Sequence, residues 1–373
     1  MSAATFNPPA SAAPIIVTTN RAAILETLCH ATELSRLELS ERTGISVPTV
    51  HRLCAQLEKE GLIAARGEKR DGNKGRPVSL FRFRSESHAV LAVAIRSDRM
   101  IGALVGLDGT VLKHLQYPCP HDDEEKGYNY VATTIDLLRT LQRHAQDAGI
   151  PCHGIGVAVP GIVQPNGLVS HAPELGWVDV PLPSILEKSF SEEVLVENNA
   201  NAFTYGEWSR GVAQGRNPVV GFFPERIGVG SGIVCDGGIL HGYRGGAGEV
   251  GSMLTGTTAL NAYHINAGDL ETQFAQLIAK APDSNPEVQR QLRDLTVLSI
   301  ANISALIDPE TIVISPSISM AGARRLIDAA RERLTGRIPH VPQIVMSQLG
   351  DMAPIVGVGE LIAERVRGGI FNG

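Results

Sequence analysis

The sequence predicts a small N-terminal domain of short helices followed by a larger α/β body with two lobes. Within the first 86 residues, three runs have the apolar spacing of helices and two short runs have the alternation of strands. From His88 onward, glycine becomes frequent and strand-like runs alternate with helix-like ones. A chain of 373 residues is long enough for two or three structural units.

The composition is that of an ordinary globular protein. Hydrophobic residues make up 43% of the chain and charged residues 19%, which is ample for a sizeable core. No apolar run reaches the roughly 20 residues that a membrane span needs. Five cysteines are scattered without a C-x-x-C pair, which favours reduced thiols over a disulfide framework. We therefore expect a cytoplasmic protein.

The two parts of the chain differ in charge. The first 86 residues carry twelve Lys and Arg against nine Asp and Glu, a net +3, and the total of -6 leaves -9 for the rest. A basic first part on an acidic body indicates a polyanion partner for the first part only. Residues 1–18 are rich in Ala, Ser and Pro without a basic start or a long apolar run, so we expect a disordered tail rather than a secretion signal.

Residues 19–86 have the element order of a winged helix-turn-helix domain, in which three helices precede a two-stranded ribbon. The predicted elements are a helix capped by Thr19 or Asn20, a second from the capping box Ser35–Glu38 to Gly44, a third from Ser46 to Gly61, and strands at 62–65 and 78–83. The second and third helices form the helix-turn-helix, and the basic ribbon forms the wing.

This geometry places the N-terminal turn of the third helix in the major groove of DNA. There a threonine can contact a thymine methyl group and an arginine can bind guanine through two hydrogen bonds, while the wing can bind phosphates or enter the minor groove. The alternative is a small helical domain with a solvated, charged hairpin. The predicted DNA contacts are Ser46, Pro48, Thr49, His51 and Arg52 in the helix, and Lys74, Gly75 and Arg76 in the wing.

Residues 87–373 form the predicted α/β body. The runs "AVLAVAI" and "MIGALVGLDGTVLKHLQY" predict strands with a tight turn at Asp108–Gly109, and "HGIGVAVPG" predicts a buried strand after an amphipathic helix. A second buried strand, "ETIVISPS", and a closing helix, "GVGELIAERVRG", follow later. Two rounds of strands and crossover helices indicate two lobes with a ligand cleft between them.

Six motifs follow one another in this body. They are "GIGVAVPGIV", "LGWVDVPL", "VENNANAF", "GVGSGIVCDGGILHG", "GGAGEVG" and "LET". Together with the N-terminal domain they resemble the ROK family of repressors and sugar kinases, from about Asn20 to the C-terminus. The resemblance implies an actin-like ATPase body. Members with a winged helix are sugar-responsive transcriptional repressors, usually dimers or tetramers, and members without it phosphorylate sugars with ATP and magnesium.

The resemblance also shows which kinase parts this chain lacks. The family kinases use the Asp of an E-N-D triplet as general base, but the triplet here is Glu197–Asn199, and an amide cannot take the proton. Bulky or acidic side chains and a proline stand where glycines approach phosphate, which disfavours a nucleotide. These positions are Ala94, Arg96, Ser97, Asp98 and Ser315–Pro316. Only Gly228–Gly232 remains as a phosphate-type loop, or as a simple hairpin turn.

The zinc site of the family is degraded as well. Its ligand positions are matched here by Ser252, Ala262, His264 and Asp269. Only two of these can bind a metal, whereas a structural zinc needs four ligands. We expect a loop held by ordinary packing and no metal, while metal binding by His264 and Asp269 stays open.

The sugar-binding positions implied by the resemblance are better kept. Amides and carboxylates suit a polyol because each can bridge two hydroxyls. Each acid alone could be a surface or helix-cap residue. The implied effector-binding residues are Asn198, Asn199, Glu249, Ser252 and Glu271, where Ser252 replaces a family histidine.

The sequence therefore predicts a sequence-specific DNA-binding transcriptional regulator, a repressor, controlled by a sugar or sugar derivative in a body without kinase activity. It predicts a DNA operator as partner, a homodimer or homotetramer, no cofactor and no catalytic residue. The alternative is an ATP-dependent sugar kinase with an attached regulatory head, and an activator is also open. The sequence does not identify the effector or the target genes.

Overall fold

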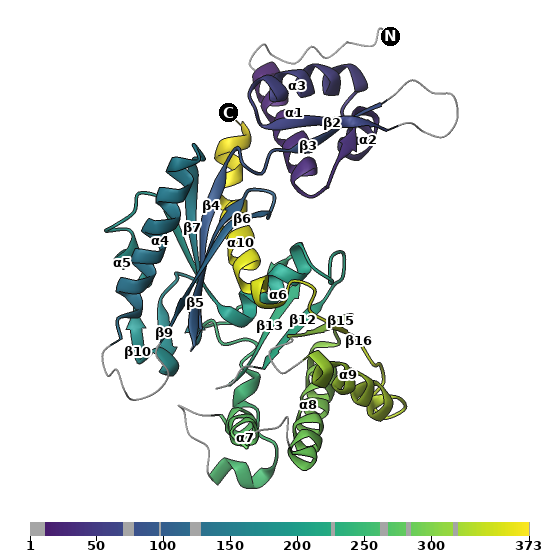
Figure 1. Ribbon diagram of the computed structural model, residues 1–373. Helices are drawn as coiled ribbons and strands as arrows, with labels where there is room; N and C mark the ends of the chain where they lie inside the picture. Colours follow the sequence, from purple (N-terminus) through teal and green to yellow (C-terminus); the bar gives the residue numbers. More distant parts are fainter. Residues whose placement is uncertain are drawn as a thin grey trace, which may run out of the picture.

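The computed structural model has a small head at one end of a two-lobed body (Figure 1). The C-terminal helix runs through the body and ends beside the head. Within the described residues, no helix is long and apolar enough to cross a bilayer. The structure describes residues 12–69, 78–96, 98–119, 128–224, 228–261, 268–280, 285–315 and 320–372.

The head is a three-helix domain with a two-stranded wing, as predicted. Its elements are α1 (Ala12–Cys29), β1 (Leu34–Ser35), α2 (Arg36–Thr43), α3 (Val47–Lys59), β2 (Ile63–Lys69) and β3 (Val78–Phe83). The predicted capping box is present, because Ser35 Oγ accepts from Glu38 N and the Glu38 side chain accepts from Ser35 N. Gly44 ends α2 with a φ of 70°, a conformation that glycine adopts without strain.

The first helix begins earlier than predicted. The start expected at Thr19 or Asn20 is wrong, because α1 begins at Ala12 and includes the last part of the tail predicted at 1–18. Alanine is the strongest helix former, and Pro14 is tolerated because the first turn has no partner for its backbone N–H. The predicted border between residues 86 and 87 falls in the connection that follows β3.

The first lobe is built on a five-stranded sheet. Its strands are β4 (Ala89–Ile95), β5 (Arg99–Gly106), β6 (Val111–Pro118), β7 (Cys152–Val159) and β11 (Glu193–Asn198), and its helices are α4 (Tyr130–Asp147) and α5 (Leu182–Leu186). The order is β11-β7-β4-β5-β6, with an antiparallel meander from β4 to β6 and parallel pairs β4–β7 and β7–β11. The predicted strand "AVLAVAI" is β4 along its whole length, and it is entirely buried.

The second lobe repeats this arrangement. Its strands are β12 (Val219–Pro224), β13 (Val229–Cys235), β14 (Gly238–Ile239), β15 (Thr311–Ile314) and β16 (Gln343–Met346), and its helices are α7 (Asp269–Ile278), α8 (Pro286–Ile307) and α9 (Met320–Leu334). In the order β14-β13-β12-β15-β16, the first three strands are antiparallel and the last two join in parallel. Two rounds of the same topology confirm the predicted pair of lobes.

Shorter elements complete the two lobes. They are a small sheet of β8 (Ile162–Val163), β9 (Val169–Ala172) and β10 (Trp177–Val180), and the 3-10 turns η2 (Pro173–Leu175), η3 (Val250–Ser252), η4 (Thr257–Asn261) and η6 (Gly350–Met352). The strands of this sheet are antiparallel. It lies at the end of the first-lobe sheet that faces the second lobe (Figure 1).

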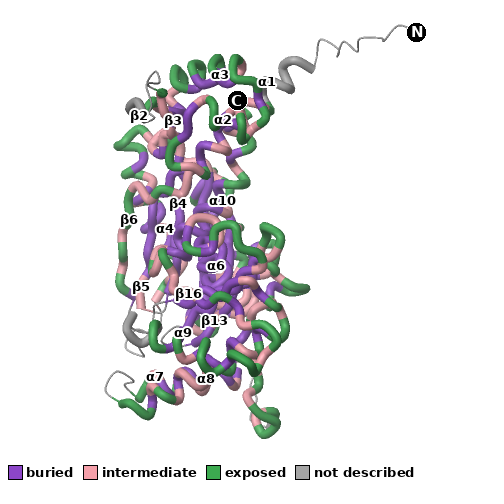
Figure 2. The backbone as a smooth tube through the Cα atoms, turned by 90° about the vertical axis from the view of Figure 1, so that its right-hand side faces the viewer, coloured by how far each residue is buried: buried purple, intermediate pink, exposed green. Residues whose placement is uncertain are grey.

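Two helices join the lobes, α6 (Asn199–Ser209) and α10 (Ala353–Asn372). Both lie in the buried centre of the molecule (Figure 2). They cross at very short range, which Gly206 and Gly357 permit because neither has a Cβ. A Cβ on Gly206 would collide with the carbonyl of Ala353, and one on Gly357 with the carbonyl of Ala202. This close crossing is a packing of backbone on backbone, which leaves little freedom for either helix to slide.

Candidate functional site

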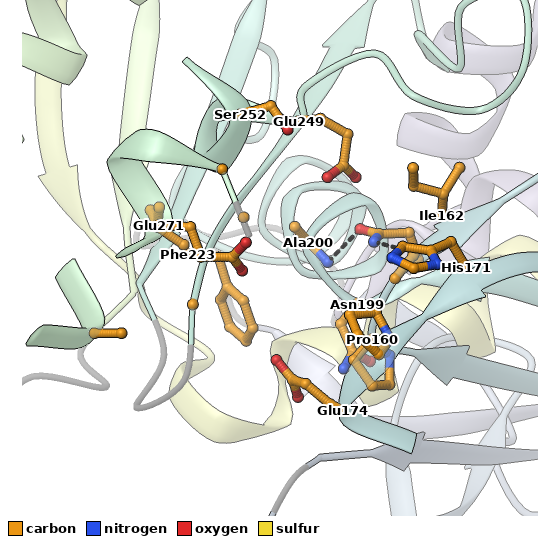
Figure 3. Close-up of a pocket in the computed structure, with 18 of the residues that line it drawn as sticks. Pro160, Ile162, His171, Glu174, Asn199, Ala200, Phe223, Glu249, Ser252 and Glu271 are labelled. Carbon is orange, nitrogen blue, oxygen red and sulfur yellow. Dashed lines mark hydrogen bonds between the residues drawn. The ribbon is translucent and has the colours of Figure 1, made fainter. Parts of the chain in front are cut away.

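A cavity of about 560 Å³ lies between the two lobes. The first lobe contributes the residues around Pro160 and His171, and the second lobe contributes Phe223 and the start of α7 (Figure 3). All five of the predicted effector-binding residues line this one cavity: Asn198, Asn199, Glu249, Ser252 and Glu271. The sequence places them up to 73 positions apart, between 198 and 271, and the fold brings them together.

The two asparagines hold the junction between β11 and α6. Asn198 is the N-cap of α6, and its Oδ1 accepts from the backbone of Ala200 and Asn201. Its amide nitrogen donates to the carbonyl of Gly161 at 2.7 Å. Both polar atoms of the Asn198 side chain therefore have partners, and the side chain stabilises the start of α6 at the cavity.

Asn199, the first residue of α6, is only 4% exposed and hydrogen-bonds to strand β4 of the first lobe. Its Nδ2 donates to the carbonyl of Ile95 at 2.8 Å. Its Oδ1 has no hydrogen-bond partner in the described structure, although a buried amide oxygen without one is costly. A carboxylate at this position would face the Ile95 carbonyl without a proton to donate, so the site suits an amide.

Two carboxylates face the cavity from the second lobe. Glu249 precedes η3 and Glu271 lies in the first turn of α7, and both point into the space (Figure 3). Glu249 reaches the solvent of the cavity, yet surrounding protein atoms and the charge of Glu271 raise its pKa to about 7. Burial also raises the pKa of Glu271, against the hydrogen bond from the Gly268 backbone and the nearby ring of His171. Neither acid forms an ion pair with a described residue.

Sequence reasoning missed two polar residues of this site, His171 in β9 and Glu174 in η2. Nε2 of His171 is buried and has no hydrogen-bond partner in the described structure. Both residues lie just before Trp177, inside the stretch that leads into the motif "LGWVDVPL". Their nearness to that motif is a signal that could have identified them.

The loop expected to replace the zinc site is held by hydrogen bonds. Oδ2 of Asp269 accepts from the backbone N–H and from the hydroxyl of Thr255, each at 2.7 Å. These bonds lower the pKa of Asp269. Ser252 lines the cavity, while Ala262 and His264 lie outside the described residues. Among the described residues, no group of three or more His, Cys, Asp or Glu could hold a metal ion.

The turn that matches the first phosphate loop is filled by a buried arginine. Arg96 is 6% exposed and pairs with Asp351 of the second lobe at 2.9 Å, and its guanidinium stacks over Phe223. Arg99 adds ion pairs to Asp98 and Asp351. Ser97 and Pro316 lie outside the described residues, and Ser315 is buried at the end of β15. The arginine joins the two lobes at the turn that the resemblance matches to the phosphate loop of the family kinases.

The predicted loop at Gly228–Gly232 is confirmed only for Gly228, which lies in the connection between the antiparallel strands β12 and β13, and is wrong from Val229 onward. Val229 to Cys235 form strand β13, and its glycines make room for α6. A Cβ on Gly230 would lie 3.0 Å from the methyl group of Ala200, and one on Gly232 would collide with the Ala200 carbonyl. The glycines are therefore explained by helix packing rather than by a phosphate.

The head presents its predicted DNA contacts to solvent. Ser46, Pro48, His51 and Arg52 are exposed on the first turns of α3, and Thr49 is half-buried. Ser46 is the N-cap as predicted, but its hydroxyl hydrogen-bonds to the Thr49 hydroxyl at 2.9 Å rather than to the helix backbone. The apolar face of α3 is buried against the other helices, which leaves the polar face free. The predicted wing contacts Lys74, Gly75 and Arg76 lie outside the described residues.

Comparison with known proteins agrees with both parts of the structure. A family model for winged helix-turn-helix DNA-binding domains matches residues 18–64, and the ROK family model matches residues 90–277. The chain is 24% identical to the xylose repressor of Bacillus spizizenii over 374 aligned residues, which cover 92% of this chain and 95% of that protein.

Solved structures show the same fold. The crystal structure of a ROK family transcriptional regulator, a homolog of the E. coli MLC protein, aligns with a TM-score of 0.69 and 19% identity over 95% of this chain and 98% of that one. A ROK family glucokinase from Streptomyces griseus, in complex with glucose and AMPPNP, aligns with a TM-score of 0.60 and 20% identity over 73% of this chain and 98% of that one. The family model spans half of the sequence, and the chain belongs to the ROK family of proteins.

Proposed function

We propose that this protein is a DNA-binding transcriptional repressor whose ROK body binds a sugar or sugar derivative and does not phosphorylate it. The observation that carries the proposal is the union of a winged helix-turn-helix head with a cavity lined by all five implied effector-binding residues. The likeness along most of the chain to a protein named a xylose repressor supports it. Because a repressor must bind its operator DNA, the proposed location of the protein is the cytoplasm.

The cavity favours a neutral or cationic polyol over an anion. Its orphaned amide oxygen on Asn199 and the carboxylates of Glu249 and Glu271 accept hydrogen bonds from hydroxyl or ammonium groups. No Lys or Arg occurs among the described residues that line it. Since a phosphate or carboxylate ligand would add charge beside two acids that already repel each other, sugar phosphates and sugar acids are disfavoured.

The absence of kinase activity is part of the proposal. Asn199 has no carboxylate to accept the proton of a sugar hydroxyl, and its amide is committed to the Ile95 carbonyl. Arg96 pairs with Asp351 where the phosphate loop of a kinase would lie. A coupled assay of ATP turnover with hexoses, pentoses and N-acetylhexosamines tests this, and turnover that depends on Asn199 would refute it.

DNA binding is expected from paired heads. A homodimer or homotetramer would place two copies of α3 on the two halves of a palindromic operator. Replacement of Arg52 by Ala should weaken discrimination between operator and random DNA by about 5- to 150-fold, because a bidentate contact to guanine is worth about 1–3 kcal/mol. The matched control is Arg42→Ala, a basic residue in the last turn of α2 rather than on α3.

Two measurements test the whole proposal. A thermal-shift screen against sugars and polyols should find a ligand that raises the melting temperature, because a ligand that binds only the native state stabilises it. A gel-shift assay should show preference for the promoter region of the protein's own operon at physiological salt, and the same ligand should change that affinity. No preference over random DNA would refute the assignment as a regulator.

A further inference from the structure

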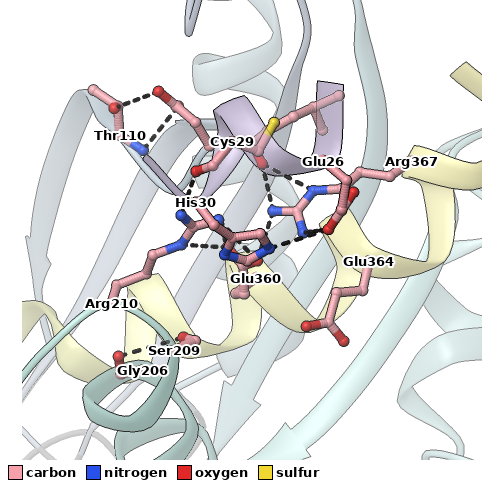
Figure 4. Close-up of polar contacts among 12 residues, drawn as sticks. Glu26, Cys29, His30, Thr110, Gly206, Ser209, Arg210, Glu360, Glu364 and Arg367 are labelled. Atoms are coloured by element: carbon pink, nitrogen blue, oxygen red, sulfur yellow. Dashed lines mark hydrogen bonds and ion pairs between the residues drawn. The ribbon is translucent and has the colours of Figure 1, made fainter. Parts of the chain in front are cut away.

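Helix α6 connects the effector cavity to the head. Its first residues, Asn199 and Ala200, line the cavity, and its cap residue Asn198 does so as well. The helix is eleven residues long, about 16 Å at the rise of an α-helix, and Arg210 follows its last residue. Arg210 in turn contacts the last residue of α1 in the head (Figure 4).

The helix is built to move as one body. Every residue from Asn199 to Glu207 is buried. Glu207 accepts hydrogen bonds from the backbone of Val212 and of Gln348 and Leu349, and from the hydroxyl of Ser347. Because α6 is also packed backbone to backbone on α10, a displacement at its pocket end cannot be absorbed by local side-chain motion.

The far end of α6 is held by a buried ionic cluster. Arg210 forms two hydrogen bonds of 2.9 Å to the carboxylate of Glu360, which is fully buried in α10. Arg367 lies seven residues further along α10. It pairs with the same carboxylate at 2.6 Å and donates to the carbonyl of Leu107. The cluster therefore joins α6, α10 and the turn that follows β5.

The same cluster reaches the head at two points. The third nitrogen of Arg210, Nη1, donates to the carbonyl of Cys29 at 2.5 Å, at the C-terminus of α1 where helix carbonyls lack partners. Arg367 pairs with Glu26 of α1 at 3.3 Å. Figure 4 shows both guanidinium groups between α1 and α10, with Arg210 coming from the end of α6.

We propose that Arg210 is the positioning residue through which occupancy of the cavity sets the orientation of the DNA-binding head. A ligand that draws the two lobes together shifts α6 at its pocket end, and the helix passes this shift through the guanidinium to the end of α1. The inference rests on the proposed function and adds to it the route of regulation. It requires that effector and operator affinities be linked reciprocally.

A second attachment of the head supplies the control. Arg21 of α1 donates to the carbonyl of Phe371 at the end of α10 and pairs with Glu60 at 2.7 Å. This arginine holds the head to the body without touching α6. Arg21→Lys and Arg210→Lys each keep a positive charge and lose the planar fork that reaches two partners at once. The pair separates loss of the α6 contact from loss of any head-to-body contact.

The first experiment reads the head directly by hydrogen exchange in the full-length protein. Asn198→Ala removes the cap of α6 at the pocket end, and we expect it to change the exchange rates of the last α1 amides by about fivefold or more. In the Arg210→Lys background the same substitution should change them less than about twofold. An equal change in both backgrounds, or no change in either, overturns the proposal.

The second experiment measures operator affinity with and without sugar. The probe is whichever of D-xylose, D-glucose, D-glucosamine and N-acetyl-D-glucosamine gives the largest thermal shift. Saturation should change the affinity of the wild type and of Arg21→Lys by about 5- to 150-fold, and that of Arg210→Lys by less than about twofold, while its affinity for the sugar stays within about threefold. A full response in Arg210→Lys, or an equal loss in Arg21→Lys, overturns the proposal.

The two experiments fail separately. If no sugar alters operator affinity in the wild type while Asn198→Ala still acts on α1 only through Arg210, the route stands and the proposed function falls. If sugar controls operator binding equally well in Arg210→Lys, the proposed function stands and the route is wrong.

Discussion

The cavity between the lobes and the neighbouring β4–β5 turn adjoin at Phe223, but their polar groups differ in whether they have partners. At the turn, Arg96 and Arg99 both pair with Asp351, and Arg99 also pairs with Asp98. In the cavity, the Asn199 Oδ1 and His171 Nε2 atoms are buried without a partner. Glu249 and Glu271 face the same space with raised pKa values.

This difference separates structural polar groups from groups that are arranged for a ligand. The charges at the turn pair with one another, and Arg96 ties the turn to Asp351 and Phe223. The cavity keeps groups that cost folding free energy until a molecule with hydroxyl or amino groups meets them. Under the proposed function, the cleft binds a sugar but no longer binds a phosphate, and the following substitutions test that separation.

The largest effect is expected from Asn199→Asp, which restores the residue type of a kinase base. The carboxylate would lose the bond to the Ile95 carbonyl and bury a charge against it, so we expect a loss of about 3 kcal/mol in unfolding free energy. ATP turnover should stay absent because Arg96 still fills the turn. Urea unfolding and a coupled kinase assay measure both. A stable, ATP-hydrolysing variant would show that the separation rests on this residue alone.

A smaller effect is expected from Arg96→Met, which keeps the volume of the side chain and removes its charge. The variant loses the pairing with Asp351 and the stacking on Phe223, together about 1–2 kcal/mol, because Asp351 remains hydrated. Sugar affinity measured by calorimetry should change less than about threefold. If the sugar no longer binds, the turn is part of the effector site, and the cavity and the turn are not functionally separate.

The sequence predicted the regular elements well where local signals act alone. The capping box at Ser35–Glu38 and the uniformly apolar strand Ala89–Ile95 are examples, because the spacing within a few residues decides each one. The start of α1 was misplaced since Thr19 is a good cap in isolation, whereas the preceding alanines continue the helix. Gly230 and Gly232 were assigned to a loop because the sequence does not show that α6 packs on them.

The site was predicted only in part, because the sequence does not show which distant residues pack together. The resemblance located Asn199, Glu249 and Glu271, and the fold placed them on one cavity. The cluster of Arg210 and Glu360 was not predictable, because its members lie 150 positions apart and are polar residues that sequence reasoning assigns to the surface. Such pairs become visible only when the packing of α6 and α10 is known.

Asp269→Asn tests the interpretation of the former zinc loop and has a moderate expected effect. The amide keeps one acceptor but weakens the bonds from Thr255, so unfolding free energy should fall by about 1 kcal/mol. The expected result for a chelator is no change in melting temperature, since Thr255 and Gln273 occupy this carboxylate. A fall in melting temperature on addition of EDTA, reversed by zinc, would restore a metal to this loop.

The smallest effect, and the one that depends on pH, is expected from Glu249→Gln. In the unfolded chain this carboxyl titrates near its ordinary value of 4.5, and in the folded protein near 7. Below the lower value both states hold the proton and the group is neutral to stability. Between the two values the unfolded state ionises first, so Glu249 destabilises the folded protein more and more as pH rises, and this destabilisation is complete above about 7.

Glu249→Gln should therefore leave the melting temperature unchanged near pH 4 and raise it slightly near pH 8, because only the ionised acid repels Glu271. The gain is small since the carboxylate reaches the solvent of the cavity. The matched control is Glu332→Gln, on the exposed face of α9. The variant should also bind the effector more weakly, and a stabilised protein with poorer binding is the behaviour expected of a residue kept for a ligand. Equal melting temperatures at both pH values would place Glu249 with the satisfied charges of the β4–β5 turn instead.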